Sequence, residues 1–422
     1  MNKTITIPKE WKKIKLGDFI DFRNGYAFNS KKYTSGGKII IRMSNISVDG
    51  ELNINNSNIK YTDENTFREL SDYQLKKNDL IMCMTDVSKE FGVVGKTAII
   101  DKDDTYILNQ RVGRIRLSEE LNVNFLHYYT NSKYFLNDIY QKVTGSAQYN
   151  LSTTDIKQSK ILLPPLPEQQ KIAEILSCVD EDIEKTDHII EETEKLKRGL
   201  MQKLLTNGIG HKKFKKTKLG TIPEDWSFAR LSEITDLITK GTTPTTYGHS
   251  FTEQGVNFIK VENITKDGKI EIGECKKISL ITHEFLKRSK LQENDILFSI
   301  AGALGRTAIV HNNCLPANTN QAVALIRLRE KKLVNFVEIL LRTESVIKQI
   351  QNEKVQLAQA NLSLKKLGNV YLPIPPKDEL TEIDSIIQEI TNKIFLNKKI
   401  KNKLTELKKG LMQDLLSGRV RV

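Results

Sequence analysis

A glycine-rich run contains the first residues whose types and spacing could do chemistry. Residues 92–97 read GVVGKT, like the second half of a phosphate-binding loop, in which backbone N–H groups surround the phosphates of a nucleotide. That loop requires another glycine five residues before its Gly-Lys-Thr. Here the position holds Glu90, whose carboxylate repels phosphate. The run instead predicts a glycine turn followed by a strand over residues 97–100.

The histidines and cysteines are not spaced as a metal site or a disulfide framework requires. His283 and Glu284 begin like the helix of a zinc protease, but Lys287 occupies the position of the second metal ligand. The four cysteines are scattered along the chain, which predicts reduced and mostly buried thiols. Paired carboxylates and a nucleophile elbow are also missing from the sequence. We therefore expect a chain that catalyses no reaction and binds no metal.

The composition indicates a globular protein with a polyanionic partner. The 422 residues include 65 lysines and arginines against 52 acidic residues, a formal net charge of +13. Such an excess favours nucleic acid or an anionic membrane surface as the partner. No apolar run approaches the roughly 20 residues of a membrane span, and the first residues, MNKTITIPKE, lack the apolar segment of a signal peptide. We expect a cytoplasmic protein.

The sequence is an internal duplication, with a period of roughly 211 residues. TIPKEW at residues 6–11 returns as TIPEDW at 221–226, and AQYNLS at 147–152 returns as AQANLS at 358–363. GKTAI at residues 95–99 likewise returns as GRTAI, with arginine in place of lysine. A second nucleotide site is not expected in one chain, so the repeated glycine turn favours a cation that contacts DNA.

Each copy divides into two unlike parts. In the first copy, short apolar runs at residues 38–43, 79–84, 97–100 and 113–117 alternate with Gly, Asn, Asp and Ser, which predicts strands and turns. Apolar residues at helical spacing predict a helix near residues 122–137. We interpret this part as a mixed α/β domain.

The second part of each copy predicts a long helix that begins after a proline cluster. Its apolar residues recur every three or four positions, which predicts a coiled-coil-like helix of about 38 residues that pairs with its equivalent in the other copy. Thr186 and Asn397 interrupt the pattern, either as tolerated imperfections or as residues that fix the register. The apolar positions are Ile172, Leu176, Val179, Ile183, Ile190, Leu196, Leu200 and Leu204, then Ile383, Ile387, Ile390, Ile394, Leu404, Leu407, Leu411 and Leu415.

Taken together, these motifs resemble those of the specificity (S) subunits of type I restriction-modification systems. The Thr-Ile-Pro-x-x-Trp openings, the proline-rich starts of the helices and the GLMQxLL runs at 199–205 and 410–416 carry the resemblance, with the closing SGRVRV at 417–422. The resemblance covers essentially the whole chain. The order of the motifs, duplicated at the right period, is more specific than any one of them.

This resemblance implies an α+β fold with two mixed α/β target recognition domains, two long antiparallel coiled-coil helices and pseudo-twofold symmetry. The implied domains are residues 1–163 (first recognition domain), 164–212 (central helix), 213–370 (second recognition domain) and 371–422 (C-terminal helix). Each recognition domain would read one half of a split site in double-stranded DNA. The paired helices would set the gap between the half-sites.

The resemblance also implies partners. Two modification (methyltransferase) subunits would dock on the helices, and ATP-dependent restriction subunits would complete the nuclease. S-adenosylmethionine, ATP and Mg²⁺ are then expected on partner subunits and no cofactor on this chain. In agreement, the sequence has neither the glycine-rich S-adenosylmethionine motif nor the Asn/Asp-Pro-Pro-aromatic motif of amino-methyltransferases. Two alternatives are a methyltransferase with its own recognition domains, which would need those motifs, and a coiled-coil dimerising DNA-binding regulator or scaffold.

Loops that differ between the copies are where two half-site specificities would be encoded. Gln and Asn suit adenine, Arg suits guanine and Lys mostly meets phosphate, so Arg111 and Gln148 are predicted to contact base edges. The shared Asn109-Gln110 and Asn320-Gln321 pairs favour a structural hydrogen bond instead. The candidate DNA-binding residues of the first domain are Asn24, Tyr26, Asn29, Lys31, Ser88, Lys89, Lys96, Arg111, Gln148 and Tyr149. Those of the second are Lys240, Thr242, Thr243, Thr246, Tyr247, Arg306, Gln356 and Gln359.

Overall fold

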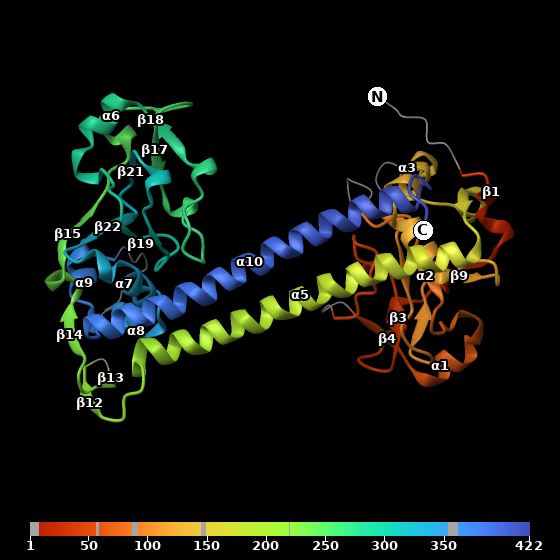
Figure 1. The fold of residues 1–422 in the computed structure, drawn as a ribbon, viewed down its shortest axis with the longest axis horizontal. Helices are drawn as coiled ribbons and strands as arrows, with labels where there is room; N and C mark the ends of the chain where they lie inside the picture. Colours follow the sequence, from red (N-terminus) through yellow and green to blue (C-terminus); the bar gives the residue numbers. More distant parts are fainter. Residues whose placement is uncertain (1–7, 56–58, 87–91, 145–148, 219, 353–361) are drawn as a thin grey trace. The chain divides into compact units, whose positions relative to one another are not determined.

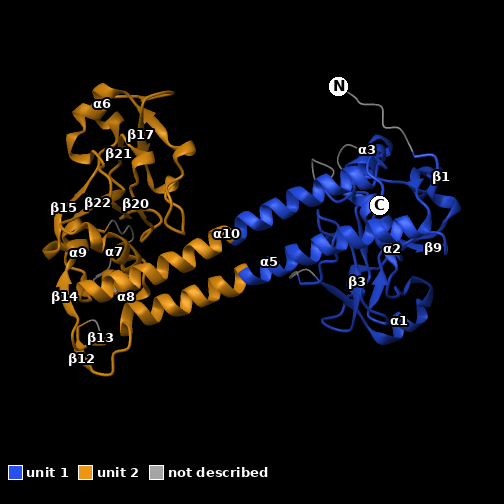
Figure 2. Ribbon diagram, in the orientation of Figure 1, with its two compact units in different colours: residues 1–189, 397–422 blue, residues 190–396 orange. Residues whose placement is uncertain are grey.

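The chain divides into two compact units, shown in Figures 1 and 2. The computed structural model describes residues 8–55, 59–86, 92–144, 149–218, 220–352 and 362–422. Unit 1 comprises residues 1–189 and 397–422, blue in Figure 2, and unit 2 comprises residues 190–396, orange in Figure 2. Each unit combines small sheets, short helices and part of two long helices, which confirms the α+β class.

Unit 1 is built around a four-stranded antiparallel sheet in the order β2-β9-β5-β7. The central strand β5 is apolar and buried at every position because both faces of the sheet are covered. Leu80 and Met82 join one hydrophobic core, whereas Ile81 and Cys83 join another, as the two-residue period of a strand requires. The strands are β2 (Ile20–Asn24), β5 (Leu80–Cys83), β7 (Thr97–Ile99) and β9 (Val112–Leu117).

The remaining strands of unit 1 form three smaller sheets. In the three-stranded sheet β4-β3-β8, β3 pairs with β8 in parallel. Two-stranded sheets pair β1 with β11 and β6 with β10. The bounds are β1 (Lys12–Lys15), β3 (Lys38–Ile41), β4 (Lys60–Thr62), β6 (Thr85–Asp86), β8 (Tyr106–Leu108), β10 (Tyr149–Asn150) and β11 (Lys160–Leu163).

The helix predicted near residues 122–137 is in fact two helices, α2 (Val123–Asn131) and α3 (Lys133–Lys142). The break falls at Ser132, which has extended backbone angles and caps α3 by accepting a hydrogen bond from the Phe135 backbone N–H. The apolar spacing continues across the break, so periodicity alone did not reveal it. The short helices α1 (Glu64–Glu69) and α4 (Thr153–Gln158) complete unit 1.

Unit 2 repeats this plan. Its four-stranded sheet has the order β15-β22-β19-β20, and β19 again separates two cores, with Ile296 and Phe298 in one and Leu297 in the other. A second sheet has the order β16-β18-β17-β21. The strands are β15 (Thr235–Lys240), β16 (Phe251–Thr252), β17 (Val256–Ile259), β18 (Lys276–Ile278), β19 (Ile296–Ser299), β20 (Thr307–Ile309), β21 (Ala317–Thr319) and β22 (Val323–Leu328).

Among the described residues of unit 2 there are two further pairs of strands and four short α-helices. Strand β14 (Ser227–Arg230) pairs with β23 (Tyr371–Ile374), as β1 pairs with β11 in unit 1. A hairpin of β12 (Phe214–Thr217) and β13 (Gly220–Pro223) follows the first long helix. The helices are α6 (Leu280–Phe285), α7 (Val334–Leu341), α8 (Glu344–Asn352) and α9 (Leu364–Gly368).

Two long helices run through both units. Helix α5 (Leu166–Asn207) begins in unit 1 and ends in unit 2, whereas α10 (Lys377–Leu415) does the reverse. Their 42 and 39 residues correspond to helices about 63 Å and 58 Å long. Within unit 1 they pair antiparallel, because Asp180 meets Lys408 at 2.5 Å while Asp187, further along α5, meets Lys401 at 2.6 Å.

The apolar stripe of the helices differs from the predicted one at two equivalent positions. Leu196 and Leu407 were assigned to the stripe, but their exposed fractions are 56% and 50%. Thr193 is buried instead, and Lys197 is half-buried, so that burial and, to a lesser extent, the nearby Arg342 lower its pKa. In unit 1 the equivalent Lys408 lies 5.5 Å from the centroid of the Tyr128 ring, so a basic residue contacts the domain there too. Thr186 donates to the Asp182 carbonyl of its own helix at 2.7 Å, so its hydroxyl is satisfied without a partner helix.

Candidate nucleic-acid interface

In unit 1, several predicted DNA-binding residues follow the end of β2. Asn24 is exposed, and its side-chain oxygen accepts a hydrogen bond from the Thr153 hydroxyl at 3.0 Å. Tyr26 is 37% exposed and lies edge-on to Phe28 and Tyr73, with ring centroids 5.0 Å and 5.5 Å away. These aromatic contacts restrict the Tyr26 ring, which stays partly exposed.

The next two predicted residues belong to the following turn. The Asn29 side chain accepts a hydrogen bond from the Lys31 backbone N–H at 3.0 Å and so caps the turn, which leaves its amide nitrogen to donate. The Lys31 side chain is exposed. The turn therefore presents an amide donor and an ammonium group from one rigid segment, a combination suited to a base edge beside a phosphate.

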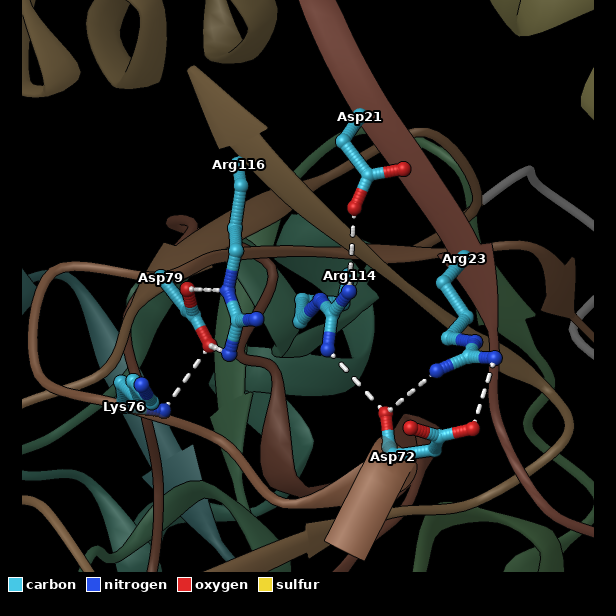
Figure 3. Close-up of polar contacts among 7 residues, drawn as sticks. All are labelled: Asp21, Arg23, Asp72, Lys76, Asp79, Arg114 and Arg116. Atoms are coloured by element: carbon cyan, nitrogen blue, oxygen red, sulfur yellow. Dashed lines mark hydrogen bonds and ion pairs between the residues drawn. The ribbon is translucent and has the colours of Figure 1, made fainter.

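Arginines that the sequence did not single out hold this region together, as Figure 3 shows. Arg114 is buried, and it donates to the Asp72 carbonyl and to the Asp21 carboxylate, both at 3.1 Å. Arg23 donates to the same Asp72 carbonyl at 3.1 Å and lies 5.3 Å from the Tyr73 ring centroid. These hydrogen bonds of Arg23 and Arg114 therefore hold the segment that carries Tyr73, and the Tyr73 ring in turn packs against Tyr26.

A second ion pair in Figure 3 is present in both copies and serves the fold. Arg116 binds the nearly buried Asp79 through two hydrogen bonds of 2.7 Å and 3.0 Å, and Arg327 binds Asp295 in the same way at 2.7 Å and 2.8 Å. Both carboxylates also accept a backbone N–H three residues earlier, which shapes the turn before the buried strand. The hydrogen bonds to the carboxylates raise the pKa of both arginines.

In unit 2 the equivalent loop follows β15 and is rich in hydroxyl groups. Thr242 accepts a hydrogen bond from Arg288 at 3.2 Å, and the Thr243 hydroxyl donates to the Gln321 side chain. The sequence does not single out Arg288, because only the fold brings its turn beside Thr242. Lys240 at the end of β15 and Thr246 in the loop are exposed.

Tyr247 completes this loop and is 57% exposed. Its ring lies 5.3 Å from that of Phe285, which is 52% exposed at the end of α6. The neighbouring Leu280 and Ile281 on α6 are also exposed, at 67% and 77%. Unit 2 thus adds apolar contacts, which suit the thymine methyl group, to a surface that in unit 1 is mainly polar. The sequence does not predict the contact between Tyr247 and Phe285, because the loop and α6 are far apart in the chain.

The duplicated glycine turns have the predicted form. Gly95 and Gly305 adopt positive φ angles of 79° and 87°, and each turn leads directly into a strand, β7 or β20. A side chain at Gly95 would come within 2.8 Å of Ile139, so the turn also packs against α3. The turns belong to the fold of each domain.

The cations that follow these glycines are half-buried. Burial and the nearby Lys408 lower the pKa of Lys96, which Asp49 partly offsets. Arg306 donates to the Ile264 carbonyl at 2.9 Å. Both side chains therefore have neighbours within their own units, and their contact with DNA stays a prediction.

The shared asparagines act structurally, as predicted. The Asn109 side chain accepts from the Arg111 backbone N–H at 3.5 Å, and Asn320 accepts from the Ala322 N–H at 3.2 Å. Arg111 is half-buried, and Tyr149 is half-buried opposite Asp86 in the β6–β10 pair. Five predicted DNA-binding residues lie outside the described residues: Ser88, Lys89, Gln148, Gln356 and Gln359.

A buried glutamate explains why the tryptophan motif is duplicated. Glu168, near the start of α5, accepts a hydrogen bond from Trp11 Nε1 at 3.0 Å, and Glu379, near the start of α10, accepts one from Trp226 Nε1 at 2.8 Å. Arg421 forms an ion pair with Glu168 at 2.5 Å. Each recognition domain is thereby tied to the beginning of the helix that follows it.

Unit 1 also attaches its domain to the helices through a polar cluster. The Tyr128 hydroxyl donates to Asp180 on α5 at 2.8 Å, and the same carboxylate binds Lys408 on α10. Burial, and to a lesser extent Lys408, lowers the pKa of His127 to about 4. The imidazole is therefore neutral at physiological pH, and α2 meets both helices at one point.

In the part of the chain that the structure describes, no group of three or more His, Cys, Asp or Glu side chains is arranged to hold a metal ion. Among the same residues, no helix combines the length and apolarity that crossing a bilayer requires.

Comparison with known proteins identifies relatives of the whole chain. The model of the type I restriction modification DNA specificity domain matches twice, at residues 8–195 and 223–406. The putative type I restriction enzyme MjaX specificity subunit of Methanocaldococcus jannaschii is 28% identical over 99% of this chain and 95% of its own length. The EcoBI specificity subunit of Escherichia coli is 27% identical over 99% of this chain and 91% of its own.

Solved structures share the fold. The S subunit of a type I restriction-modification system from M. genitalium superposes with a TM-score of 0.55 at 17% identity, over 99% of this chain and 98% of that one. A structure that describes complex assembly and conformational transition of the type I R-M system gives a TM-score of 0.61 at 18% identity, over 98% and 100% of the two chains.

Proposed function

Since the chain belongs to the family of type I restriction modification DNA specificity domains, we propose that it is the DNA sequence-specificity subunit of a type I restriction-modification enzyme. One observation carries this function: the specificity domain occurs twice in one chain, once with each recognition domain. Each domain reads one half of a bipartite DNA site. Two exposed loop systems with different side chains, one around Tyr26 and one around Tyr247, suit two different half-sites.

The paired helices set the gap between the half-sites and dock two methyltransferase subunits. Exposed apolar side chains on these helices support the docking: Ile189, Leu196, Phe395, Leu396, Ile400 and Leu407 are each at least 45% exposed. Such side chains on a helix that already has a partner favour a further protein partner. Leu196 and Leu407 are equivalent residues of the two copies, which suits two copies of the same subunit.

This chain contributes recognition and assembly, and the partners contribute chemistry. S-adenosylmethionine belongs to the methyltransferase subunits, and ATP and Mg²⁺ belong to restriction subunits that complete the nuclease. The basic excess of the chain supplies phosphate contacts, which strengthen DNA binding without selecting a sequence.

Co-expression of the chain with methyltransferase subunits, followed by mapping of methylated adenines, tests the function. We expect one motif made of two short half-sites with a fixed gap. The methyltransferase subunits expressed without this chain are the control and should produce no such motif. A continuous motif, or methylation that does not depend on the chain, would contradict the proposal.

A further inference from the structure

The two-stranded sheet that precedes each long helix is basic in both copies. In unit 1, β1 and β11 carry four exposed lysines, Lys12, Lys13, Lys15 and Lys160. In unit 2 the equivalent strands β14 and β23 carry Arg230, and the hairpin β12–β13 lies beside them. Residues 212–223, which include this hairpin, contain five lysines and no acidic residue, and four of the five are exposed: Lys212, Lys213, Lys216 and Lys218. We name these two surfaces the basic faces.

Among the described residues, no lysine of either face forms an ion pair with a carboxylate. Two acids beside the faces have other partners: Glu10 pairs with Arg421 at 2.7 Å, and Asp225 lies 3.9 Å from His211. Lys215 of the hairpin does contact an acidic residue, but its ammonium donates to the backbone carbonyl of Glu224 at 2.7 Å and not to the carboxylate. Elsewhere many exposed lysines pair with acids, as Lys195 does with Glu192 at 2.7 Å. Lysines that no carboxylate neutralises, gathered on one small sheet or hairpin, point to a polyanionic ligand.

An aromatic side chain organises the face of unit 2. The Lys218 ammonium and the Arg230 guanidinium lie 5.6 Å and 5.4 Å from the centroid of the Tyr371 ring, and Arg230 also donates to the Tyr371 hydroxyl at 3.0 Å. Phe228 lies beside the same ring at 6.0 Å and is 43% exposed. Cations from a hairpin and from a strand are thus held together at one place.

The positive charge is kept although the residues are not. Lys12 and Lys13 follow Trp11 as Ser227 and Phe228 follow Trp226, so neither lysine is repeated. Lys160 pairs with Lys15 in unit 1, where Tyr371 pairs with Arg230 in unit 2. The second copy replaces the missing lysines with those of its hairpin. The two copies thus share the positive charge of this surface but not its side chains. This suits a ligand that is recognised by charge alone.

We propose that the two basic faces bind the phosphate backbone of duplex DNA without regard to its sequence. They lie on other elements than the recognition loops, which follow β2 and β15: the sheets β1–β11 and β14–β23, whose second strands end just before α5 and α10, and the hairpin β12–β13, which follows α5. Lysine is a compact point charge that suits phosphate, and each contact releases condensed counterions from the duplex. The choice of DNA as the polyanion rests on the proposed function.

Salt titration of DNA binding by the full-length chain tests the proposal. Fluorescence anisotropy with a labelled random-sequence duplex would give Kd at several NaCl concentrations for wild type, Lys13→Ala/Lys15→Ala in unit 1 and Lys216→Ala/Lys218→Ala in unit 2. We expect each double variant to lower the slope of log affinity against log salt by about 1 per lost contact. The affinity for random and target duplexes should fall by the same factor.

Two controls separate a specific face from net charge and from misfolding. Lys331→Ala/Lys332→Ala removes two exposed lysines from another part of unit 2 and should leave the salt slope unchanged. Lys216→Arg/Lys218→Arg keeps the charge and should restore wild-type binding. Thermal unfolding midpoints that match wild type would show that the alanine variants are folded.

The proposal is overturned if both alanine variants keep the wild-type slope, or if the Lys331/Lys332 control lowers it equally. It is also overturned if the variants bind DNA normally and instead lose the methyltransferase subunits, because the faces would then contact acidic protein surfaces. Binding of the chain to a random-sequence duplex does not depend on recognition of the half-sites. A complex that methylates no split site would therefore count against the proposed function and leave this measurement intact.

Discussion

Arg111 is the described residue for which the sequence predicts a base contact most directly. It follows the turn closed by Asn109, so its backbone position is fixed while its side chain is half-buried. Arginine that donates two hydrogen bonds to guanine gives about 1–3 kcal/mol of discrimination. Its neighbour in the prediction, Gln148, lies outside the described residues.

Arg111→Ala should relax recognition of the first half-site only. Methylation mapping of the co-expressed complex measures both half-sites at once, so the second half-site is an internal control. Tolerance of other bases at one position of the first half-site is the expected result. An unchanged motif would remove Arg111 from the set of base-reading residues.

His127 makes stability depend on pH. Its pKa of about 4 in the folded chain lies below the usual value of 6.5, so the unfolded chain binds a proton that the folded chain excludes. Stability should therefore be fully present above about pH 6.5 and fall as the pH drops toward 4, by at most about 3 kcal/mol. Thermal unfolding midpoints measured between pH 4.5 and 7.5 should show the decline.

His127→Gln should flatten this part of the pH profile, since glutamine does not titrate. His188→Gln is the matched control, because His188 is exposed on α5 of the same unit, and it should leave the profile unchanged. An equally steep decline in the His127 variant would show that other groups cause the acid sensitivity.

At the scale of elements, the long helices carry both an internal register and an outward apolar surface. The register in unit 1 is set by Asp180 with Lys408 and by Asp187 with Lys401. The two ion pairs lie seven residues apart on each helix. They therefore hold the same register over about two helical turns. Thr186, between them, bonds its own helix and adds no cross-helix hydrogen bond.

A length change in the helices should change the gap between the half-sites. Inserting four residues in α5 between Ile172 and Leu196, with a matching insertion in α10 to keep the ion pairs in register, adds slightly more than one turn, or about 6 Å. Methylation mapping should then show a gap longer by about one or two base pairs, with both half-sites unchanged. A changed half-site with an unchanged gap would contradict the assignment of the helices as spacer.

Leu196→Asp and Leu407→Asp should weaken assembly with the methyltransferase subunits and leave folding nearly intact. Both leucines are at least half exposed, so their substitution should change stability by no more than about 0.5 kcal/mol. Co-purification measures assembly. Gln202→Asp introduces the same charge at an exposed position of α5 and should assemble normally. Full assembly of both leucine variants would move the docking surface elsewhere.

At the scale of the whole molecule, we propose that the chain recognises DNA and assembles the complex, whereas its partners catalyse. This division predicts that the isolated chain does not bind S-adenosylmethionine. Isothermal titration of the chain with the cofactor should give only the heat of dilution, whereas the complex with methyltransferase subunits should give a binding isotherm. Saturable binding by the chain alone would favour a methyltransferase that carries its own recognition domains.

The sequence by itself determined the duplication, the α+β class and the long helices. Repeated motifs and apolar periodicity are local in the chain, and the helices form wherever a stripe of apolar side chains finds a partner. The glycine turn at residues 92–97 also follows from sequence, because a positive φ angle, here that of Gly95, favours glycine.

Only the tertiary structure decided which side chains share a surface. Arg288 meets Thr242, and Phe285 meets Tyr247, across more than thirty residues of chain. Sequence patterns carry no signal for such pairs, because packing between distant segments brings them together. The same is true of the rotation that exposes Leu196 and turns Lys197 inward, since an amphipathic helix defines an apolar face and the neighbouring domain decides which part of it is covered.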